Sequence, residues 1–289
     1  MKVLGKGTAN GAISILHSLG LGKGCSIGIE LSTEVTLVDK ETTISDDRHG
    51  LLGAVEKCWR SEGFPLPEEF GWVISSDLPI GQGLKSSSAL ANAAFRALNN
   101  GSWTGLSDPD IADLSVAAQR IAKCTVTGSM DDTWASLQRG WKLVDPTLSS
   151  SDSIILEGEI EEDYCVIIIL RGRRRAIIAE DSFRLQRPIF ERSLASVMSG
   201  SPIDSLSSNG IAVAAATNDH LALRISNLLI ASGAVASGIT GSGPCISVLC
   251  HKENKNMLRD KIHDMGLEAI STRLSRSSVL EEEEAIGWE

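Results

Sequence analysis

A segment rich in glycine and serine carries the clearest chemical signal in this chain: Pro79-Ile-Gly-Gln-Gly-Leu-Lys-Ser-Ser-Ser-Ala89. An alanine-rich run with helical spacing follows at residues 90–98, so we predict a loop that leads into a helix. The first turn of a helix has unpaired N–H groups and a partial positive charge, which favour phosphate. Glycines let the backbone approach phosphate, and serine hydroxyls can bind its oxygens or ligate magnesium. The alternative is a plain helix start with a serine cap.

The common phosphate-loop patterns do not describe this segment. The Walker A pattern G-x-x-x-x-G-K-[ST] fails because Leu84 separates Gly83 from Lys85. The dinucleotide pattern G-x-G-x-x-G fails because Ser86 stands at the third glycine position. Any nucleotide binding here therefore belongs to a different kind of loop.

Two further segments could carry chemistry. Thr127-Gly-Ser-Met-Asp-Asp132 places adjacent carboxylates beside a glycine turn, and an aspartate can accept the proton of an attacking alcohol in phosphoryl transfer. The alternative is a side-chain cap of the following helix. Gly238-Ile-Thr-Gly-Ser-Gly-Pro244 could bind an anion or a small substrate through its backbone, or it could be only a tight turn into a buried strand.

The elements that must position these segments alternate without strict βαβ order, which favours an α+β fold in two halves. Strand patterns occur at residues 26–38, 71–76, 164–170, 245–250 and 268–275. Helical patterns occur at residues 51–60, 90–98, 108–123, 183–199, 209–232 and 253–265. The serine-rich run at residues 146–153 is the predicted linker, which gives an N-terminal half at 1–150, a C-terminal half at 151–280 and an acidic tail at 281–289.

Composition limits the class of function. The net charge of −10 and the single tyrosine and five phenylalanines argue against a nucleic-acid-binding surface. No apolar stretch approaches the ~20 residues needed to span a bilayer, so no membrane partner is expected. The six cysteines are scattered without a C-x-x-C pair, as in reduced thiols of a cytoplasmic protein. The five histidines form no ligand spacing, and we expect them to be surface or packing residues.

The three segments, in this order, resemble the GHMP kinase superfamily. The phosphate loop of that superfamily reads roughly P-x-x-x-G-L-G-S-S-A, and residues 79–89 match it except that Lys85 replaces a glycine. Its acidic motif matches Gly128-Ser-Met-Asp-Asp132, and its C-terminal glycine motif matches Gly241-Ser-Gly243. The resemblance implies a GHMP kinase fold, with an N-terminal half like ribosomal protein S5 that binds ATP and a ferredoxin-like C-terminal half.

Within the superfamily, the chain is most similar to the archaeal-type shikimate kinases. That branch carries G-L-K-S-S-S-A, as residues 83–89 do, and a glycine-rich segment matched by Gly22-Lys-Gly-Cys-Ser-Ile-Gly-Ile29. The resemblance implies phosphorylation of the 3-hydroxyl of shikimate with ATP and Mg²⁺ in the biosynthesis of chorismate and aromatic amino acids. It implies a small-molecule substrate, a cytoplasmic monomer or homodimer, and no nucleic-acid partner.

The resemblance also implies a role for individual residues. Asp131 is the implied catalytic residue, and Ser87 the implied Mg²⁺ ligand. The implied nucleotide-binding residues are Pro79, Gly81, Gln82, Gly83, Leu84, Lys85, Ser86, Ser87 and Ser88. The expected substrate-binding residues are Asp132, Lys23, Thr240, Gly241, Ser242, Gly243 and Arg171.

Two positions depart from the family pattern. Arg120 stands where many relatives carry a magnesium-binding glutamate, and Ala12 stands where several carry a lysine.

Shikimate has a carboxylate, so an arginine should lie near it. Arg171 begins the densest basic cluster, at residues 171–175, and could hold that carboxylate or a phosphate. The alternative for this cluster is a solvated basic turn.

Two other functions remain open from the sequence. A homoserine kinase or another small-alcohol kinase would keep the fold and change the substrate, although homoserine kinases usually lack an aspartate at the position of Asp131. A ligand sensor that kept the fold and lost catalysis would explain Arg120, but not the retained pair of aspartates.

Overall fold

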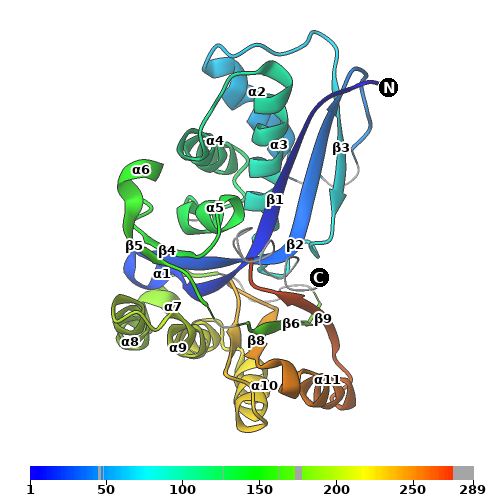
Figure 1. Cartoon of the computed structure of the whole chain (residues 1–289). Coiled ribbons are helices and arrows are strands. Elements are labelled where there is room, and N and C mark those ends of the chain that lie inside the picture. Colours follow the sequence, from blue (N-terminus) through cyan, green and yellow to red (C-terminus); the bar gives the residue numbers. More distant parts are fainter. Residues whose placement is uncertain (45–46, 48, 126, 162, 173–177, 276–289) are drawn as a thin grey trace, which may run out of the picture.

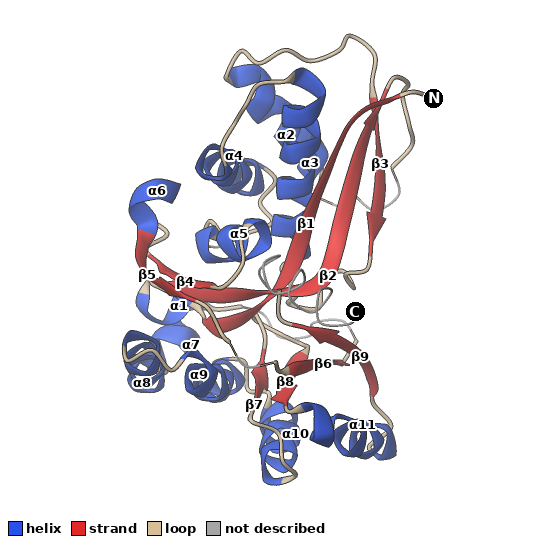
Figure 2. Cartoon of the chain, in the orientation of Figure 1, coloured by secondary structure: helices blue, strands red, loops and turns tan. Residues whose placement is uncertain are grey.

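The computed structural model describes residues 1–44, 47, 49–125, 127–161, 163–172 and 178–275. It combines helices with two antiparallel sheets, so the predicted α+β class is confirmed (Figure 1). Figure 2 shows the first sheet with helices gathered on one side of it and the smaller second sheet below. Among the described helices, none is both long and apolar enough to cross a membrane.

The first sheet has the strand order β1-β2-β4-β5, with β3 also paired to β2. Its strands are β1 (Val3–Leu16), β2 (Gly24–Val38), β3 (Gly71–Ser76), β4 (Trp141–Val144) and β5 (Ile154–Gly158). The long strands β1 and β2 form a hairpin whose connection contains the short helix α1 (Ser18–Leu21). Strand β3 pairs with the end of β2 and β4 pairs with its start, so β2 organises the whole sheet.

Helices of the first half cover one face of this sheet (Figure 1). They are α2 (Leu51–Ser61), α3 (Ser86–Ser102), α4 (Asp108–Ile121), α5 (Met130–Leu137) and the single turn α6 (Ser150–Ser153). Helix α3 lies very close to β1, since a Cβ on Gly7 would stand 2.1 Å from the carbonyl oxygen of Ala93. This contact places the middle of α3 directly against the sheet.

The second sheet has the order β7-β8-β6-β9. Its strands are β6 (Cys165–Leu170), β7 (Ala236–Ile239), β8 (Ile246–Cys250) and β9 (Glu268–Arg273). The accompanying helices are α7 (Glu180–Leu185), α8 (Arg187–Met198), α9 (Pro202–Ala216), α10 (His220–Ala231), the 3-10 turn η1 (Lys252–Asn254) and α11 (Lys255–Asp264). Helices α10 and α11 pack against this sheet, and α9 contacts both β7 and β1.

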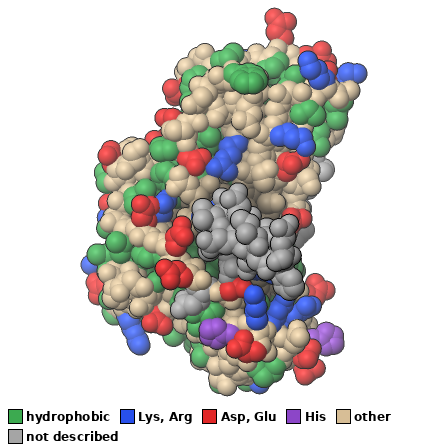
Figure 3. All heavy atoms as spheres, viewed as in Figure 1, with side chains coloured by type: hydrophobic (Ala, Val, Ile, Leu, Met, Phe, Trp, Pro, Cys, Tyr) green, Lys and Arg blue, Asp and Glu red, His purple; other side chains and the backbone are tan. Residues whose placement is uncertain are grey.

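The two sheets share one hydrophobic core. Buried residues of β1, β2, β6 and β8 belong to the same cluster, which includes Ile13, Ile27, Ile167 and Val248. After β9 the chain returns to β2, where the N–H of Ser275 donates to the carbonyl oxygen of Gly28 at 2.9 Å. On the face shown in Figure 3, acidic and basic side chains are interspersed over both halves.

Two elements differ from the sequence patterns given above. Strand β1 is a strand of 14 residues, in a range for which no strand pattern is given. The helical pattern at 209–232 divides into α9 and α10, because Asn218 adopts a left-handed φ of 54° and Asp219 caps the next helix by accepting from the N–H of Ala222 at 3.0 Å. Within the predicted linker, Ser150 is buried and bonded to Asp113.

The division of the chain at residue 150 stays a prediction. The acidic run at 281–284 lies outside the described residues, as do Arg173, Arg174 and Arg175 of the basic cluster.

Candidate active site

The predicted phosphate loop is a series of left-handed backbone positions that ends at the start of α3. Gly81 and Gly83 have φ values of 74° and 84°, and Lys85 has 62° at the N-cap. A non-glycine residue at positive φ is uncommon, so the surroundings must hold Lys85 in place. The loop leaves Ser86 and Ser87 in the first turn of α3, where backbone N–H groups lack helical partners. Both serines line a cavity of about 450 Å³.

The C-terminal glycine segment holds this loop by direct backbone contact. A Cβ on Gly83 would stand 2.3 Å from the carbonyl oxygen of Thr240, and one on Gly241 would stand 3.0 Å from the carbonyl oxygen of Gly83. The Thr240 hydroxyl donates to Gly83 O at 3.1 Å and accepts from the N–H of Ser14 at the same distance. The N–H of Cys245 donates to the carbonyl oxygen of Gln82. The two glycine motifs therefore form one unit, although 157 positions separate Thr240 from Gly83.

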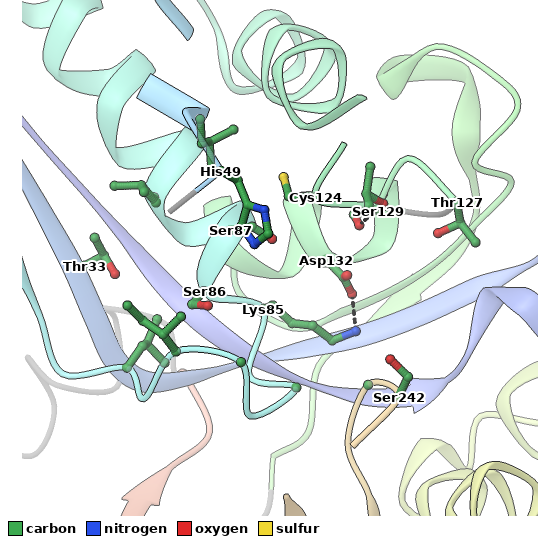
Figure 4. A pocket seen from close by; sticks show the side chains of 18 of the residues that line it. Thr33, His49, Lys85, Ser86, Ser87, Cys124, Thr127, Ser129, Asp132 and Ser242 are labelled. Carbon is green, nitrogen blue, oxygen red and sulfur yellow. Dashed lines mark hydrogen bonds and ion pairs between the residues drawn. The ribbon is translucent and has the colours of Figure 1, made fainter. Parts of the chain in front are cut away.

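The adjacent carboxylates lie at the start of α5 and face β2. Asp131 is 3% exposed, and the Ser26 hydroxyl lies 2.9 Å from its Oδ2 and 3.1 Å from Oδ1 of Asp132. Lys85 Nζ forms an ion pair with Asp132 Oδ1 at 2.5 Å (Figure 4). A Cβ on Gly24 would stand 2.6 Å from Asp131 Cγ, so only glycine leaves room for this carboxylate. The loop lysine and the two aspartates thus meet at one point.

Burial controls the protonation of Asp131. Desolvation first, and the negative charge of Asp132 second, raise the pKa of Asp131 to about 7. The Lys85 ammonium and the hydrogen bond from Ser26 act in the opposite direction. Burial, with the charge of Asp131, also raises the pKa of the neighbouring Cys25 thiol well above its usual range. A carboxylate that titrates near neutral pH within a cavity is suited to accept a proton from a substrate hydroxyl.

The cavity brings these groups together between the halves of the chain. Figure 4 shows Lys85 and Asp132 facing Ser242 across the cavity, with Ser86, Ser87, His49 and Thr33 further along it. Gly81, Gly83, Asp131 and Gly241 are also in the wall. Five further residues line the cavity, namely His17, Ser18, Thr127, Ser129 and Ile178.

Several predicted site residues do not line the cavity and instead make contacts within or beside the loops that form its wall. Leu84 is buried in the core, and Gln82 binds the carbonyl oxygen of Gly172 through its amide. The Ser88 side chain is fully buried and donates to Gln119 at 3.1 Å, so this residue can reach a ligand only through its backbone. Gly243 donates its N–H to Thr240 O, which tightens the turn. Pro79 precedes the loop and is not among the residues that line the cavity.

Two predicted substrate-binding cations have other partners. Lys23 forms an ion pair with Asp145, whose pKa falls to about 2 chiefly through that contact. Arg171 makes a two-pronged contact with Asp219, at 2.6 and 2.9 Å, and also donates to the carbonyl oxygen of Pro244 at 3.3 Å. Neither side chain lines the cavity. Arg171 instead holds the end of the C-terminal glycine segment.

The described residues contain no group of three or more His, Cys, Asp and Glu side chains that could hold a metal ion. Arg120, at the position of the family glutamate, lies beside Gly128 and donates to the carbonyl oxygen of Pro146 at 3.4 Å. The oxygen groups in the cavity wall include the Ser87 hydroxyl and the carboxylates of Asp131 and Asp132. Such oxygens fit Mg²⁺ that keeps most of its other ligands from phosphates and water.

Sequence reasoning missed Gly24, Ser26 and His17 as site residues. Gly24 and Ser26 are two positions apart on β2, so strand periodicity alone places them on the same face. The fold then brings that face against α5, which no local pattern indicated.

Sequence comparison finds relatives of this chain among proteins named as kinases. Residues 50–140 match the family described as GHMP kinases N terminal domain. A protein of Pyrococcus abyssi named shikimate kinase is 35% identical over 180 residues, which cover 58% of this chain and 63% of that protein. A protein of Methanothermobacter thermautotrophicus with the same name is 27% identical over 273 residues, which cover 91% of this chain and 92% of that protein.

Structural comparison agrees at the level of the fold. The crystal structure of the mevalonate kinase of Methanococcus jannaschii superposes with a TM-score of 0.69, at 16% identity, and the match covers 94% of this chain and 98% of that one. The match extends through both halves, and it confirms the predicted GHMP kinase fold.

Proposed function

We propose that this chain is a GHMP kinase that transfers the γ-phosphoryl group of ATP to the 3-hydroxyl of shikimate, giving shikimate 3-phosphate and ADP. The observation that carries the proposal is the position of the buried Asp131 carboxylate in the same cavity as the start of α3 and Lys85. Shikimate is the acceptor that the curated relatives suggest, one of them aligned over 91% of this chain.

The nucleotide phosphates bind at the start of α3 in this proposal. The N–H groups of Ser86 and Ser87 and the flexible backbone at Gly81 and Gly83 surround them. Lys85 neutralises phosphate charge while it remains beside Asp132. ATP enters with Mg²⁺, which would be held by the phosphates and the Ser87 hydroxyl and would neutralise charge on the transferred group.

The acceptor lies between Asp131 and the C-terminal glycine segment. Its hydroxyl oxygen attacks the γ-phosphorus, the bond to the bridging oxygen of ADP breaks, and the hydroxyl proton passes to Asp131. Ser26 orients the Asp131 carboxylate, and Asp132 with Lys85 sets its electrostatic environment. Gly241 and Ser242 form the opposite wall.

We place the enzyme in the cytoplasm as a monomer or homodimer. Free cysteines at six positions, five of them buried, suit a reducing compartment.

The test is ADP release with shikimate, homoserine and mevalonate as separate acceptors, followed by identification of the product by phosphorus NMR. We expect turnover with shikimate alone, and a fall in kcat of about 10²-fold or more in Asp131→Asn. Unchanged ATP affinity in this variant would show that the part of the cavity that binds the nucleotide is intact. Turnover with another alcohol and none with shikimate would reject the proposal, and undiminished turnover in Asp131→Asn would reject the role of Asp131.

A further inference from the structure

Helices α3, α4 and α5 pack against one another on the same face of the first sheet, and a buried chain of polar side chains joins them (Figure 1). The Ser88 hydroxyl of α3 donates to Oε1 of Gln119 in α4 at 3.1 Å. Nε2 of Gln119 donates to the Thr133 hydroxyl of α5 at 3.2 Å. Asn92 of α3 adds a link to α5, because its Nδ2 donates to the carbonyl oxygen of Thr133 at 3.0 Å. All four side chains are fully buried.

The two ends of this chain of hydrogen bonds lie next to the residues of the proposed reaction. Ser88 directly follows Ser87 in the first turn of α3, where the nucleotide phosphates are proposed to bind. Thr133 lies two positions after Asp131 in α5. The starts of α3 and α5 therefore carry the phosphate site and the proposed base. Their relative position sets the distance between the bound phosphate and the Asp131 carboxylate.

The same two helix starts are also linked on the side that faces the cavity. Lys85 at the N-cap of α3 forms an ion pair with Asp132 of α5 (Figure 4). The phosphates of a bound nucleotide attract the same ammonium group, so this link holds the helices less firmly when ATP is present. The Ser88, Gln119 and Thr133 side chains do not line the cavity, so a ligand there does not compete for their hydrogen bonds.

The amide of Gln119 lies in a setting where apolar side chains predominate. Helices α3, α4 and α5 contribute Phe95, Val116 and Trp134 to one hydrophobic cluster. Burial of an amide in such a cluster is unfavourable unless its hydrogen bonds are made, and an apolar side chain of similar size has no such requirement. The amide adds direction instead, because hydrogen bonds are sensitive to distance and angle. It fixes one hydroxyl on α3 and one on α5 at the same time.

We infer that Gln119 is a positioning residue that sets the distance between the phosphate-binding start of α3 and the Asp131 carboxylate of α5. The inference rests on the proposed function, because it takes Asp131 to accept the hydroxyl proton while the phosphates lie at the start of α3. It does not depend on shikimate as the acceptor, since the geometry is the same for any alcohol that reacts in this cavity.

Gln119→Met tests the inference, because methionine has a similar length and makes neither hydrogen bond. We expect kcat to fall about 10- to 100-fold, the scale of a catalytic group displaced by up to ~1 Å. The dissociation constant of ATP and the KM of the acceptor should stay close to those of wild type, because the groups that bind both ligands remain. An unchanged kcat in Gln119→Met would overturn the inference.

Ser115→Ala is the matched control in the same helix. Ser115 is fully buried one turn before Gln119, and its hydroxyl has no hydrogen-bond partner within the described part of the chain. Its removal should leave kcat at the value of wild type. An equal fall of kcat in Ser115→Ala and Gln119→Met would mean that any change in the core of α4 slows the enzyme, and would overturn the specific role of Gln119.

A triple variant separates positioning from stability. Gln119→Met alone leaves the Ser88 and Thr133 hydroxyls buried without this partner, which should lower the urea midpoint. Addition of Ser88→Ala and Thr133→Val removes both hydroxyls, and such replacement of all partners by apolar groups is nearly neutral for stability. We expect the urea midpoint to return toward that of wild type while kcat stays as low as in Gln119→Met. Recovery of kcat together with stability would show a purely structural role.

The double variant Gln119→Met with Asp131→Asn tests whether Gln119 acts through Asp131. Residues that act as a unit have non-additive effects, so Gln119→Met should lower the residual rate of Asp131→Asn little further. The same fold loss in wild type and in Asp131→Asn would show that Gln119 acts independently of Asp131, against the inference.

Turnover of wild type with the panel of alcohols distinguishes failure of this inference from failure of the proposed function. If wild type phosphorylates homoserine or mevalonate and not shikimate, the proposed function fails, and a lower kcat of Gln119→Met with that alcohol still supports the role of Gln119. If wild type phosphorylates shikimate and Gln119→Met has the same kcat, the inference alone fails. If wild type phosphorylates none of these alcohols, both fail.

Discussion

Gly83 of the phosphate loop lies directly against Thr240 of the C-terminal glycine segment. A Cβ on Gly83 would stand 2.3 Å from the Thr240 carbonyl oxygen, and the Thr240 hydroxyl donates to the carbonyl oxygen of Gly83 at 3.1 Å. The shape of the nucleotide loop therefore depends on a segment from the other half of the chain. Two consequences follow for substitution at Gly83: strain at its positive φ, and displacement of the backbone that it touches.

Gly83→Ala should lower both stability and ATP affinity. The strained φ of 84° alone costs about 1–3 kcal/mol, and the clash with Thr240 adds to this cost. Gly81→Ala is the matched control, because Gly81 has a φ of 74° and nothing within 4 Å of its added Cβ. Urea unfolding and ATP titration of both variants measure the difference. Equal losses in the two variants would mean that the contact with Thr240 has no energetic weight.

Gly24→Ala should disable catalysis without changing the binding of ATP. The added methyl group would stand 2.6 Å from Asp131 Cγ, so the carboxylate must move. Misplacement of a catalytic group by about 1 Å can cost about 10²-fold in rate. The measurement is kcat for ADP release, together with the dissociation constant of ATP, which should stay the same.

Gly28→Ala is the control for the effect of crowding on β2. Its Cβ would also stand 2.6 Å from a neighbour, but that neighbour is the carbonyl oxygen of Ala135, away from the carboxylates. We expect lower stability without a selective loss of kcat. A similar loss of kcat in both variants would show that crowding of the strand, and not displacement of Asp131, is responsible.

The sequence was sufficient to identify the three segments that build this site and insufficient for the contacts between them. The glycine loop and the aspartate pair are local patterns, in which a turn and a helix start are encoded within a few residues. Lys85 was predicted to bind phosphate, but its ion pair with Asp132 depends on the packing of α3 beside α5. Likewise, Arg171 was chosen for its charge, and its partner Asp219 is 48 positions away. Long-range partners of this kind leave no periodic signal in the chain.

The rate should rise with pH as Asp131 loses its proton. Since burial and the charge of Asp132 raise the pKa of Asp131 to about 7, kcat/KM should fall below neutral pH, where the base is protonated. In Lys85→Met the positive charge is lost, so the acid limb of the plot of kcat/KM against pH should move to higher pH. In Asp132→Asn the negative charge is lost, so the limb should move to lower pH. Shifts in the same direction for both variants would contradict this electrostatic arrangement.

The same raised pKa predicts a loss of stability with rising pH. An unfolded aspartate titrates near ~4, whereas folded Asp131 titrates at about 7. The folded protein therefore holds the proton more tightly, and the stabilisation present below the unfolded pKa is lost as pH rises through the folded pKa. Urea unfolding of wild type and Asp131→Asn from pH 4 to pH 7 tests this. The free energy of unfolding of wild type should fall relative to the variant, and a constant difference would contradict it.

Arg171 should prove to be a structural residue whose loss affects stability more than substrate binding. Its side chain is 12% exposed, it contacts both oxygens of Asp219, and it donates to the carbonyl oxygen of Pro244 next to the glycine segment. Replacement by alanine leaves Asp219 without this partner, and we expect a loss of about 1–3 kcal/mol in the free energy of unfolding. Asp219→Asn should lower stability in the same direction, because it weakens the same contact from the other side. If Arg171→Ala instead raises the KM for shikimate at least tenfold with unchanged stability, Arg171 binds the substrate, and the ion pair with Asp219 opens when the carboxylate arrives.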